Sequence, residues 1–92
     1  MDSFYYFLLK KLNYFGFKNL SLDDKKNFLD KGYNLIFLKT NNIHLITKKD
    51  NYYIYDSYNL LYNEKYNKGE ILDNEKLYII LKKLENLNFY IK

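Results

Sequence analysis

The sequence predicts a single small α+β domain over residues 1–92, in the order ααβββα, with a three-stranded antiparallel meander and helices packed on one face. Apolar residues recur at helical spacing near both ends of the chain, whereas the middle is rich in β-branched and aromatic residues and changes to a period of two. The chain has no Pro and three Gly, so no segment has the composition of a linker. With 48% apolar residues, the chain is rich enough for one core.

Two helices are predicted in the first third of the chain. Ser3 precedes a helix expected over Phe4–Phe15, and Gly16 ends it. The apolar stripe of this helix has four members: Phe4, Leu8, Leu12 and Phe15. Ser21 and Asp24 have the spacing of a capping box, with Asp in place of Glu or Gln, and start a short second helix.

Three strands are predicted in the middle of the chain, because aromatic and β-branched residues alternate there. The strands cover Tyr33–Thr40, Ile43–Lys49 and Tyr52–Tyr58, with two-residue turns at Asn41–Asn42 and Asp50–Asn51. If both turns have two residues, four pairs follow: Lys39 with His44, Phe37 with Ile46, Ile46 with Tyr55 and Lys48 with Tyr53.

The two faces of this predicted sheet differ in polarity. One face carries Leu35, Phe37, Lys39, His44, Ile46, Lys48, Tyr53 and Tyr55. The other face carries Ile36, Leu38, Ile43, Leu45, Ile54 and Tyr58. Since the second face is the more apolar, we expect the helices to pack on it and the first face to stay partly open to water.

The last third of the chain predicts one helix and leaves one segment open. Residues 60–72 form either a short hairpin or an ordered loop, because Lys68–Gly69 indicates a turn. Asp73 caps a helix predicted over Asn74–Asn88. Its apolar positions recur at helical spacing: Leu77, Ile80, Leu81, Leu84 and Leu87. We expect this stripe to dock on the sheet.

Composition excludes several kinds of chemistry. Without Cys there is no disulfide, thiol nucleophile or thiolate metal site, and with His44 as the one imidazole we predict no metal and no cofactor. No apolar run approaches the roughly 20 residues that span a bilayer. We therefore expect a cytoplasmic protein, in a host cell if it is phage-encoded. All 15 basic residues are Lys, and the lack of Arg disfavours base-specific reading of the major groove.

One pair of residues has the chemistry of a catalytic dyad. A two-residue turn puts His44 and Asp56 on opposite faces, whereas a three-residue turn would place them side by side. The stretch from His44 to Ser57 resembles the His and Asp strands of papain-like cysteine peptidases. Those enzymes need a Cys nucleophile, which this chain lacks, so the resemblance implies an inactive, peptidase-shaped module. No other set of residues has catalytic spacing, and we expect no enzyme.

We expect instead a non-catalytic protein that binds a macromolecule. Tyr provides large contact area at low entropy cost, and the partner contacts are predicted at Lys39, Lys48, Tyr52, Tyr53, Tyr55, Tyr62 and Tyr66. The excess of Lys, Asn, Tyr, Ile and Phe is what an AT-rich coding sequence would produce, and a short chain of this composition without an active site is typical of a phage or mobile-element accessory protein. It would block a host protein such as a defence nuclease, as anti-CRISPR inhibitors do. The alternative is a single-stranded nucleic-acid-binding module that uses the same Tyr and Lys face. A homodimer is also compatible with this surface.

Overall fold

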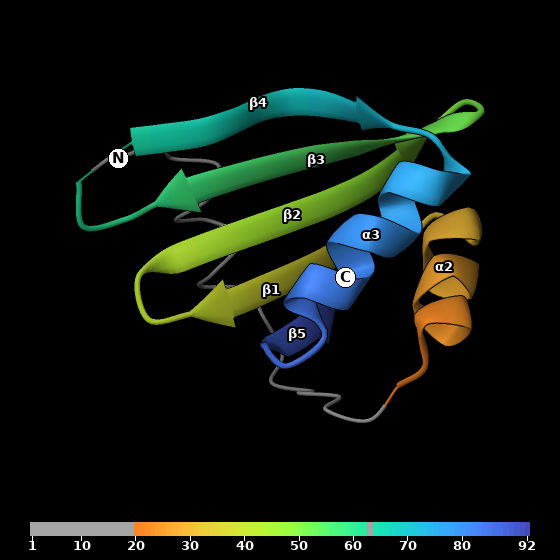
Figure 1. Ribbon diagram of the computed structural model, residues 1–92, viewed down its shortest axis with the longest axis horizontal. Coiled ribbons are helices and arrows are strands. Elements are labelled where there is room, and N and C mark those ends of the chain that lie inside the picture. Colours follow the sequence, from red (N-terminus) through yellow and green to blue (C-terminus); the bar gives the residue numbers. More distant parts are fainter. Residues whose placement is uncertain (1–19, 63) are drawn as a thin grey trace.

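The chain folds as two helices and one five-stranded antiparallel sheet in this computed structural model, which describes residues 20–62 and 64–92, the side chains of Lys65 and Tyr66 excepted (Figure 1). The elements in order are α2 (Leu22–Asp30), β1 (Leu35–Lys39), β2 (Asn42–Lys49), β3 (Tyr52–Asn59), β4 (Glu64–Leu72), α3 (Asn74–Leu84) and β5 (Asn88–Ile91). The α+β class is confirmed, but the sheet has two more strands than predicted. The helix predicted over Phe4–Phe15 lies outside the described residues.

Both helices begin where the sequence predicts. The Ser21 hydroxyl accepts a hydrogen bond from the backbone N–H of Asp24 at 3.1 Å, which satisfies one free donor of the first turn of α2. The Asp73 carboxylate does the same for the N–H of Lys76 at 2.8 Å in α3. Side-chain caps therefore define the start of both helices.

The end of α3 differs from the prediction. The helix stops at Leu84, and residues Asn88–Ile91 form β5, which pairs with β1 in antiparallel register. This strand satisfies the backbone groups along the outer edge of β1 and buries Phe89 completely. Helical periodicity continues through Leu87, so the sequence pattern hides the change of structure.

The second hairpin has the predicted register. A two-residue loop, Asp50–Asn51, pairs Ile46 with Tyr55 and Lys48 with Tyr53. Asp50 takes a φ of 55°, which Asp tolerates better than most residues. The predicted turn chemistry is confirmed here.

The first hairpin is shifted by two residues from the prediction. Its loop is Thr40–Asn41, so Phe37 pairs with His44 and Leu35 pairs with Ile46. The predicted pairs of Lys39 with His44 and Phe37 with Ile46 are therefore wrong. Since the shift is an even number of residues, each side chain keeps its predicted face.

Residues 64–72 form an edge strand, which resolves the segment that the sequence left open. β4 pairs with β3, but the register shifts twice between Tyr55 and Tyr58. Next to the first shift, the Asp56 carboxylate accepts a hydrogen bond of 2.6 Å from the N–H of Gly69, whose φ is 70°. Bulges of this kind twist an edge strand and protect it from pairing with other chains.

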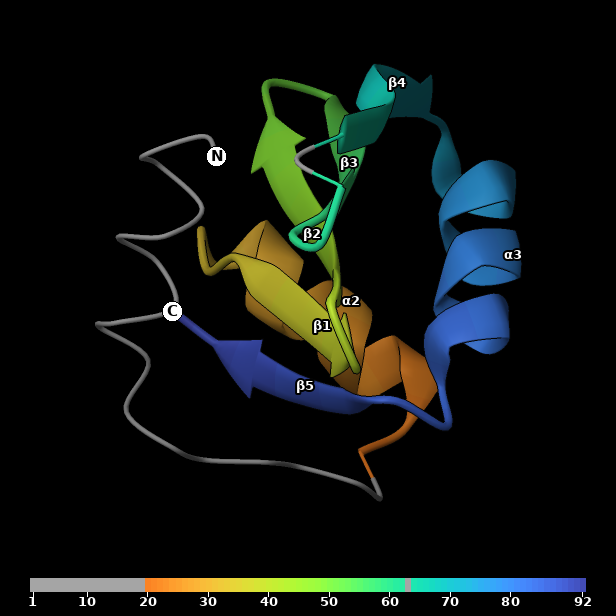
Figure 2. The same ribbon diagram turned by 90° about the vertical axis from the view of Figure 1, so that its left-hand side faces the viewer.

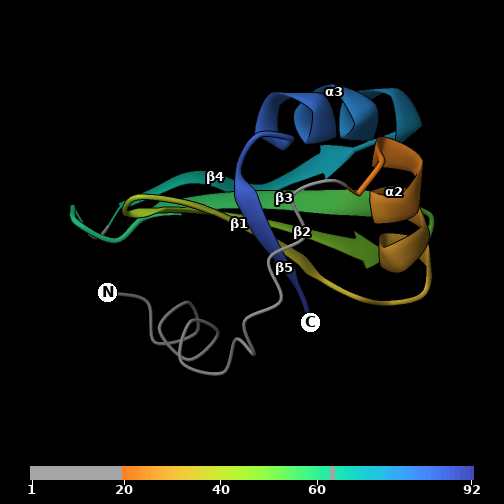
Figure 3. The same cartoon turned by 90° about the horizontal axis from the view of Figure 1, so that it is seen from below.

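The helices cover the face that was expected to be open. Figure 2 shows the sheet end-on with α3 to one side, and Figure 3 shows α3 over one face of the sheet and α2 at the end of the strands. The main core under them contains Leu29, Leu35, Phe37, Ile46, Tyr53, Tyr55, Leu72, Leu77, Leu81, Leu84 and Phe89. Packing on one face is confirmed for the two described helices, but the choice of face is wrong. Tyr and Lys side chains have apolar bodies, so a face that carries them can be buried when their polar tips find partners.

Candidate functional site

Two of the predicted contact residues are buried in the main core. The exposed fraction is 4% for Tyr53 and 7% for Tyr55, because both rings lie under the helices. The prediction that these rings are open for contact is therefore wrong. The stacking platform for single-stranded nucleic acid loses its two central rings for the same reason.

The Tyr53 hydroxyl belongs to a charged cluster at the end of α2. It donates a hydrogen bond of 2.6 Å to Asp30, whose carboxylate also binds Lys26 at 2.7 Å and Lys48 at 3.3 Å. Burial raises the pKa of Asp30, but the hydrogen bonds from Lys26, Tyr53 and Lys48 outweigh it and bring this pKa from 3.8 to about 2. Burial and the neighbouring Asp30 raise the pKa of Tyr53. Lys48, a predicted contact residue, thus has a structural partner.

His44 and Asp56 do not meet. The register places His44 opposite Ser57 and Asp56 opposite Leu45, so the two side chains project from opposite faces, as the two-residue turn predicts. The Nδ1 of His44 lies 2.9 Å from the Tyr55 hydroxyl, and burial lowers the pKa of this imidazole. The peptidase-like pair is therefore not assembled in this fold.

Lys25 is the most deeply buried charged residue of the described chain, with 1% of its surface exposed. Its ammonium lies 4.8 Å from the ring centroid of Phe89 and 5.9 Å from that of Phe37. Burial lowers its pKa, and Glu85 opposes that change. The side chain is buried beside these two rings, and its cation–π contacts serve packing.

The remaining predicted contact residues do not all lie at the same end of the sheet. Lys39 is exposed at the end of β1, and Tyr52 is half-buried at the start of β3, on the face opposite the helices. Tyr66 is part of β4, but its side chain is not among those described. Tyr62 is 71% exposed, in the turn between β3 and β4. The seven predicted residues therefore do not form one surface.

The β3–β4 turn exposes two large apolar side chains side by side in the sequence. Leu61 is 66% exposed and Tyr62 is 71% exposed, the two highest values among the large exposed hydrophobic residues of the described chain. Exposed apolar residues next to one another are typical of binding surfaces. The sequence analysis missed Leu61, although an apolar run directly after the turn-forming Asn59 was a usable signal.

Hydrogen bonds hold this turn to the neighbouring hairpin. The Asn59 side chain accepts from the N–H of Tyr62 at 2.9 Å and donates to the Asn42 side chain at 2.7 Å. The N–H of Leu60 also donates to the backbone carbonyl of Asn41 at 2.8 Å. Asn59 is itself buried, so the turn has a fixed base and a projecting apolar tip.

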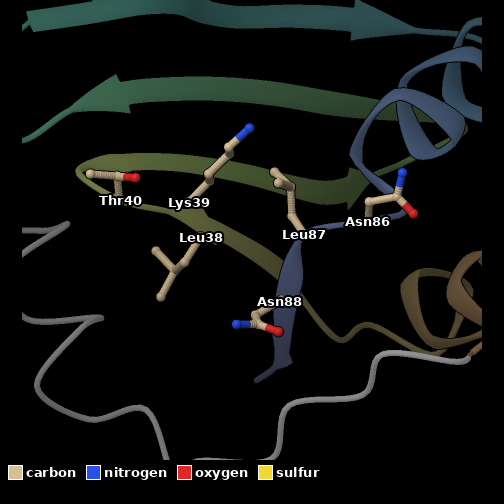
Figure 4. Close-up of a pocket in the computed structure, with 6 residues that line it drawn as sticks. All are labelled: Leu38, Lys39, Thr40, Asn86, Leu87 and Asn88. Atoms are coloured by element: carbon tan, nitrogen blue, oxygen red, sulfur yellow. The ribbon is translucent and has the colours of Figure 1, made fainter.

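A shallow pocket of about 360 Å³ lies between the end of β1 and the connection from α3 to β5 (Figure 4). It is lined by Leu38, Lys39, Thr40, Asn86, Leu87 and Asn88. These residues offer one ammonium, two amides and one hydroxyl, without a carboxylate or an imidazole. Such a lining can hold a polar group, but it provides no acid–base pair for catalysis.

The described part of the chain contains no group of three or more His, Asp or Glu residues that could hold a metal ion. None of the helices described is long and apolar enough to cross a membrane. No protein-family model, curated protein or solved structure matches the sequence or the fold. The function must therefore be argued from the surface itself.

Proposed function

We propose that this protein acts by stoichiometric binding of a protein partner, without catalysis, through Leu61 and Tyr62 of the β3–β4 turn. The observation that carries this proposal is that, of the large apolar side chains described, the two most exposed lie on a turn held by the Asn59 and Asn42 amides. A preordered turn loses little conformational entropy on binding. Tyr is also among the residues that most often dominate binding energy.

The position of the turn suits insertion into a concave surface. It lies at the end of the sheet away from α2 (Figure 1), so a partner can enclose it without displacing that helix. The bulged edge of β4 disfavours the other common mode, in which a partner strand extends the sheet. Side-chain contacts at the turn are therefore the favoured mode.

As partner we propose a host-defence nuclease, blocked by an accessory protein of a phage or mobile element. Small size, Lys-rich composition and the lack of catalytic spacing support this class. A protein of this kind acts by covering a working surface of the nuclease, so no cofactor is required. Cytoplasmic location in the host would follow from this role.

The test is a cleavage assay with a panel of purified RNA-guided and restriction nucleases, titrated with the protein. We expect inhibition at a ratio near one to one for a susceptible nuclease. The double variant Leu61→Ser with Tyr62→Ala should weaken inhibition about 100-fold, a loss of about 2.7 kcal/mol of binding energy, while the thermal melt stays unchanged. The matched control is Ile79→Ser, which removes an exposed apolar side chain from α3 and should inhibit normally.

The rival function is binding of single-stranded nucleic acid. Fluorescence anisotropy with labelled single-stranded RNA and DNA at about 50 and 200 mM salt separates the two, because phosphate contacts lose affinity steeply over this range. Tight binding that collapses with salt and survives the double variant would overturn the proposal. No binding at the lower salt concentration would leave the protein partner as the working function.

A further inference from the structure

The pocket at the end of β1 contains a positive charge and no negative one. Four of its side chains are polar: Lys39, Thr40, Asn86 and Asn88. Among the residues that the structure describes, none of these four side chains has a hydrogen-bond or ion-pair partner. The acidic residue next to the pocket, Glu85, is paired with Lys82 at 2.8 Å. The pocket therefore offers free donors and a free ammonium.

A carboxylate fits this set of groups. It accepts hydrogen bonds without donating any, whereas ammonium, amide N–H and hydroxyl groups can all donate. Its charge also balances that of Lys39, which a neutral amide or alcohol cannot do, and hydrogen bonds between charged groups are about twice as strong as neutral ones. Leu38 and Leu87 add apolar surface for the methylene groups that carry a side-chain carboxylate.

The depth of the pocket favours a side chain over a free small molecule. Sites for small molecules enclose about 70–90% of the ligand surface. This pocket is shallow and lies on the outside of the sheet end, between β1 and the connection from α3 to β5 (Figure 4). A side chain that belongs to a larger bound surface needs no such enclosure, because the rest of that surface excludes water around it.

The pocket lies at the same end of the sheet as the exposed β3–β4 turn. Thr40 lines the pocket, and the carbonyl of the next residue, Asn41, accepts a hydrogen bond of 2.8 Å from the N–H of Leu60, directly before Leu61. Since β1 and β3 are two strand spacings apart, the two features are separated by about 10 Å across the sheet. One interface of standard size, about 800 Å² on each partner, covers both.

We propose that this pocket receives an acidic side chain, Asp or Glu, of the same partner that encloses Leu61 and Tyr62. The inference rests on the proposed function and adds the chemistry of the partner: an apolar hollow with a carboxylate about 10 Å from it. Lys39 supplies the charge, and the amides of Asn86 and Asn88 orient the carboxylate oxygens. Lys39 thus regains a contact role through its place in the fold.

The pocket can be tested without the partner, by NMR titration of the full chain. The probe is glutamic acid with an acetylated amino group and an amidated α-carboxyl, so that the side-chain carboxylate is its one charge. The glutamine equivalent is the neutral control. The side-chain amide signals of Asn86 and Asn88 should shift with a dissociation constant of about 1–10 mM, as expected for one isolated contact. The glutamine probe should bind at least about tenfold more weakly.

One substitution separates the ammonium from the rest of the pocket. Lys39→Met keeps the apolar stem and removes the charge, so it should weaken binding of the glutamate probe at least about tenfold. The matched control is Lys49→Met, at an exposed position at the far end of β2, which should leave probe binding unchanged. In the cleavage assay, Lys39→Met should weaken inhibition of a susceptible nuclease about tenfold and Lys49→Met should not.

Three outcomes of the titration would overturn the inference. They are a failure of the glutamate probe to shift the two amide signals, equal binding of both probes, and unchanged binding to Lys39→Met. Tighter binding of inorganic phosphate than of the glutamate probe would assign the pocket to phosphate groups instead and also overturn it. If the glutamate probe binds but no nuclease is inhibited, the carboxylate site stands and the proposed function fails. If a nuclease is inhibited but the probe does not bind, the proposed function stands and this inference fails.

Discussion

Each face of the sheet carries a cluster of buried side chains, but the two clusters are built differently. The helix-covered face buries Tyr53 and Tyr55, and their hydroxyls are paired with Asp30 and with the half-buried His44. The opposite face is mainly aliphatic, with Ile36, Ile43 and Leu45. The helices of this protein therefore pack on the face with more polar groups. This is possible because the buried hydroxyls there have hydrogen-bond partners, such as Asp30 of α2 for Tyr53.

Substitutions of two adjacent residues of β1 should give the largest effects, and they compare the two faces directly. Ile36 and Phe37 point to opposite faces, and both are fully buried. We expect Phe37→Ala to reduce the free energy of unfolding by about 3–5 kcal/mol and Ile36→Ala by about 2–5 kcal/mol, measured by urea denaturation. A cost near zero for Ile36→Ala would show that the second face is not packed in solution.

The second test removes one buried hydroxyl from the helix-covered face. Tyr53→Phe deletes the hydroxyl that donates to Asp30 at 2.6 Å, and we expect a loss of about 1.5–2 kcal/mol, because the acceptor is charged. Tyr62→Phe, at an exposed ring, should cost almost nothing in the same denaturation experiment. If both variants lower the free energy of unfolding equally, the hydrogen bond from Tyr53 to Asp30 does not stabilise the fold.

The third test follows the pH dependence of the Asp30 cluster. The folded pKa of about 2 lies below the ordinary value of 3.8, so the ionised carboxylate stabilises the fold above about pH 4. This stability is lost as the pH falls from about 4 to 2. Because Asp30 is partly exposed, solvent screening limits the effect to about 1 kcal/mol. Asp30→Asn should lower stability at neutral pH and flatten this part of the stability profile.

The smallest expected effect concerns the turn between β1 and β2, which sets the register of these two strands. Thr40 takes a φ of 55°, which is strained for a β-branched residue. Thr40→Gly should raise the free energy of unfolding by about 0.5–1 kcal/mol. Asp50→Gly relieves a milder strain at the same φ and should give a smaller gain. A loss of stability in Thr40→Gly would mean that the Thr side chain has a packing role.

Local signals in the sequence were sufficient for much of the fold. Ser21 and Asp73 mark the helix starts because capping is a local interaction. The register of β2 and β3 follows from one two-residue turn. The face on which each strand residue lies also follows, since successive side chains of any strand point to opposite faces of the sheet.

The features that depend on distant partners could not be predicted in the same way. β5 forms because β1 offers an edge, and no signal near Asn88 announces that edge. The buried Tyr53 donates a hydrogen bond to Asp30, a contact across 23 positions of the chain. At the exposed site Tyr62 was predicted, whereas its neighbour Leu61 was missed although the apolar run after Asn59 was a usable signal.

The position of β5 in the sheet also affects how the protein can be made. β1 is synthesised early, but its outer edge is paired by residues Asn88–Ile91, and Phe89 completes the core beside Phe37. A nascent chain that has not yet released β5 from the ribosome therefore exposes an unpaired strand and an unfilled core. Folding is therefore completed only after this strand emerges. Until then the exposed strand edge and core make the nascent chain prone to aggregation, which chaperones can prevent.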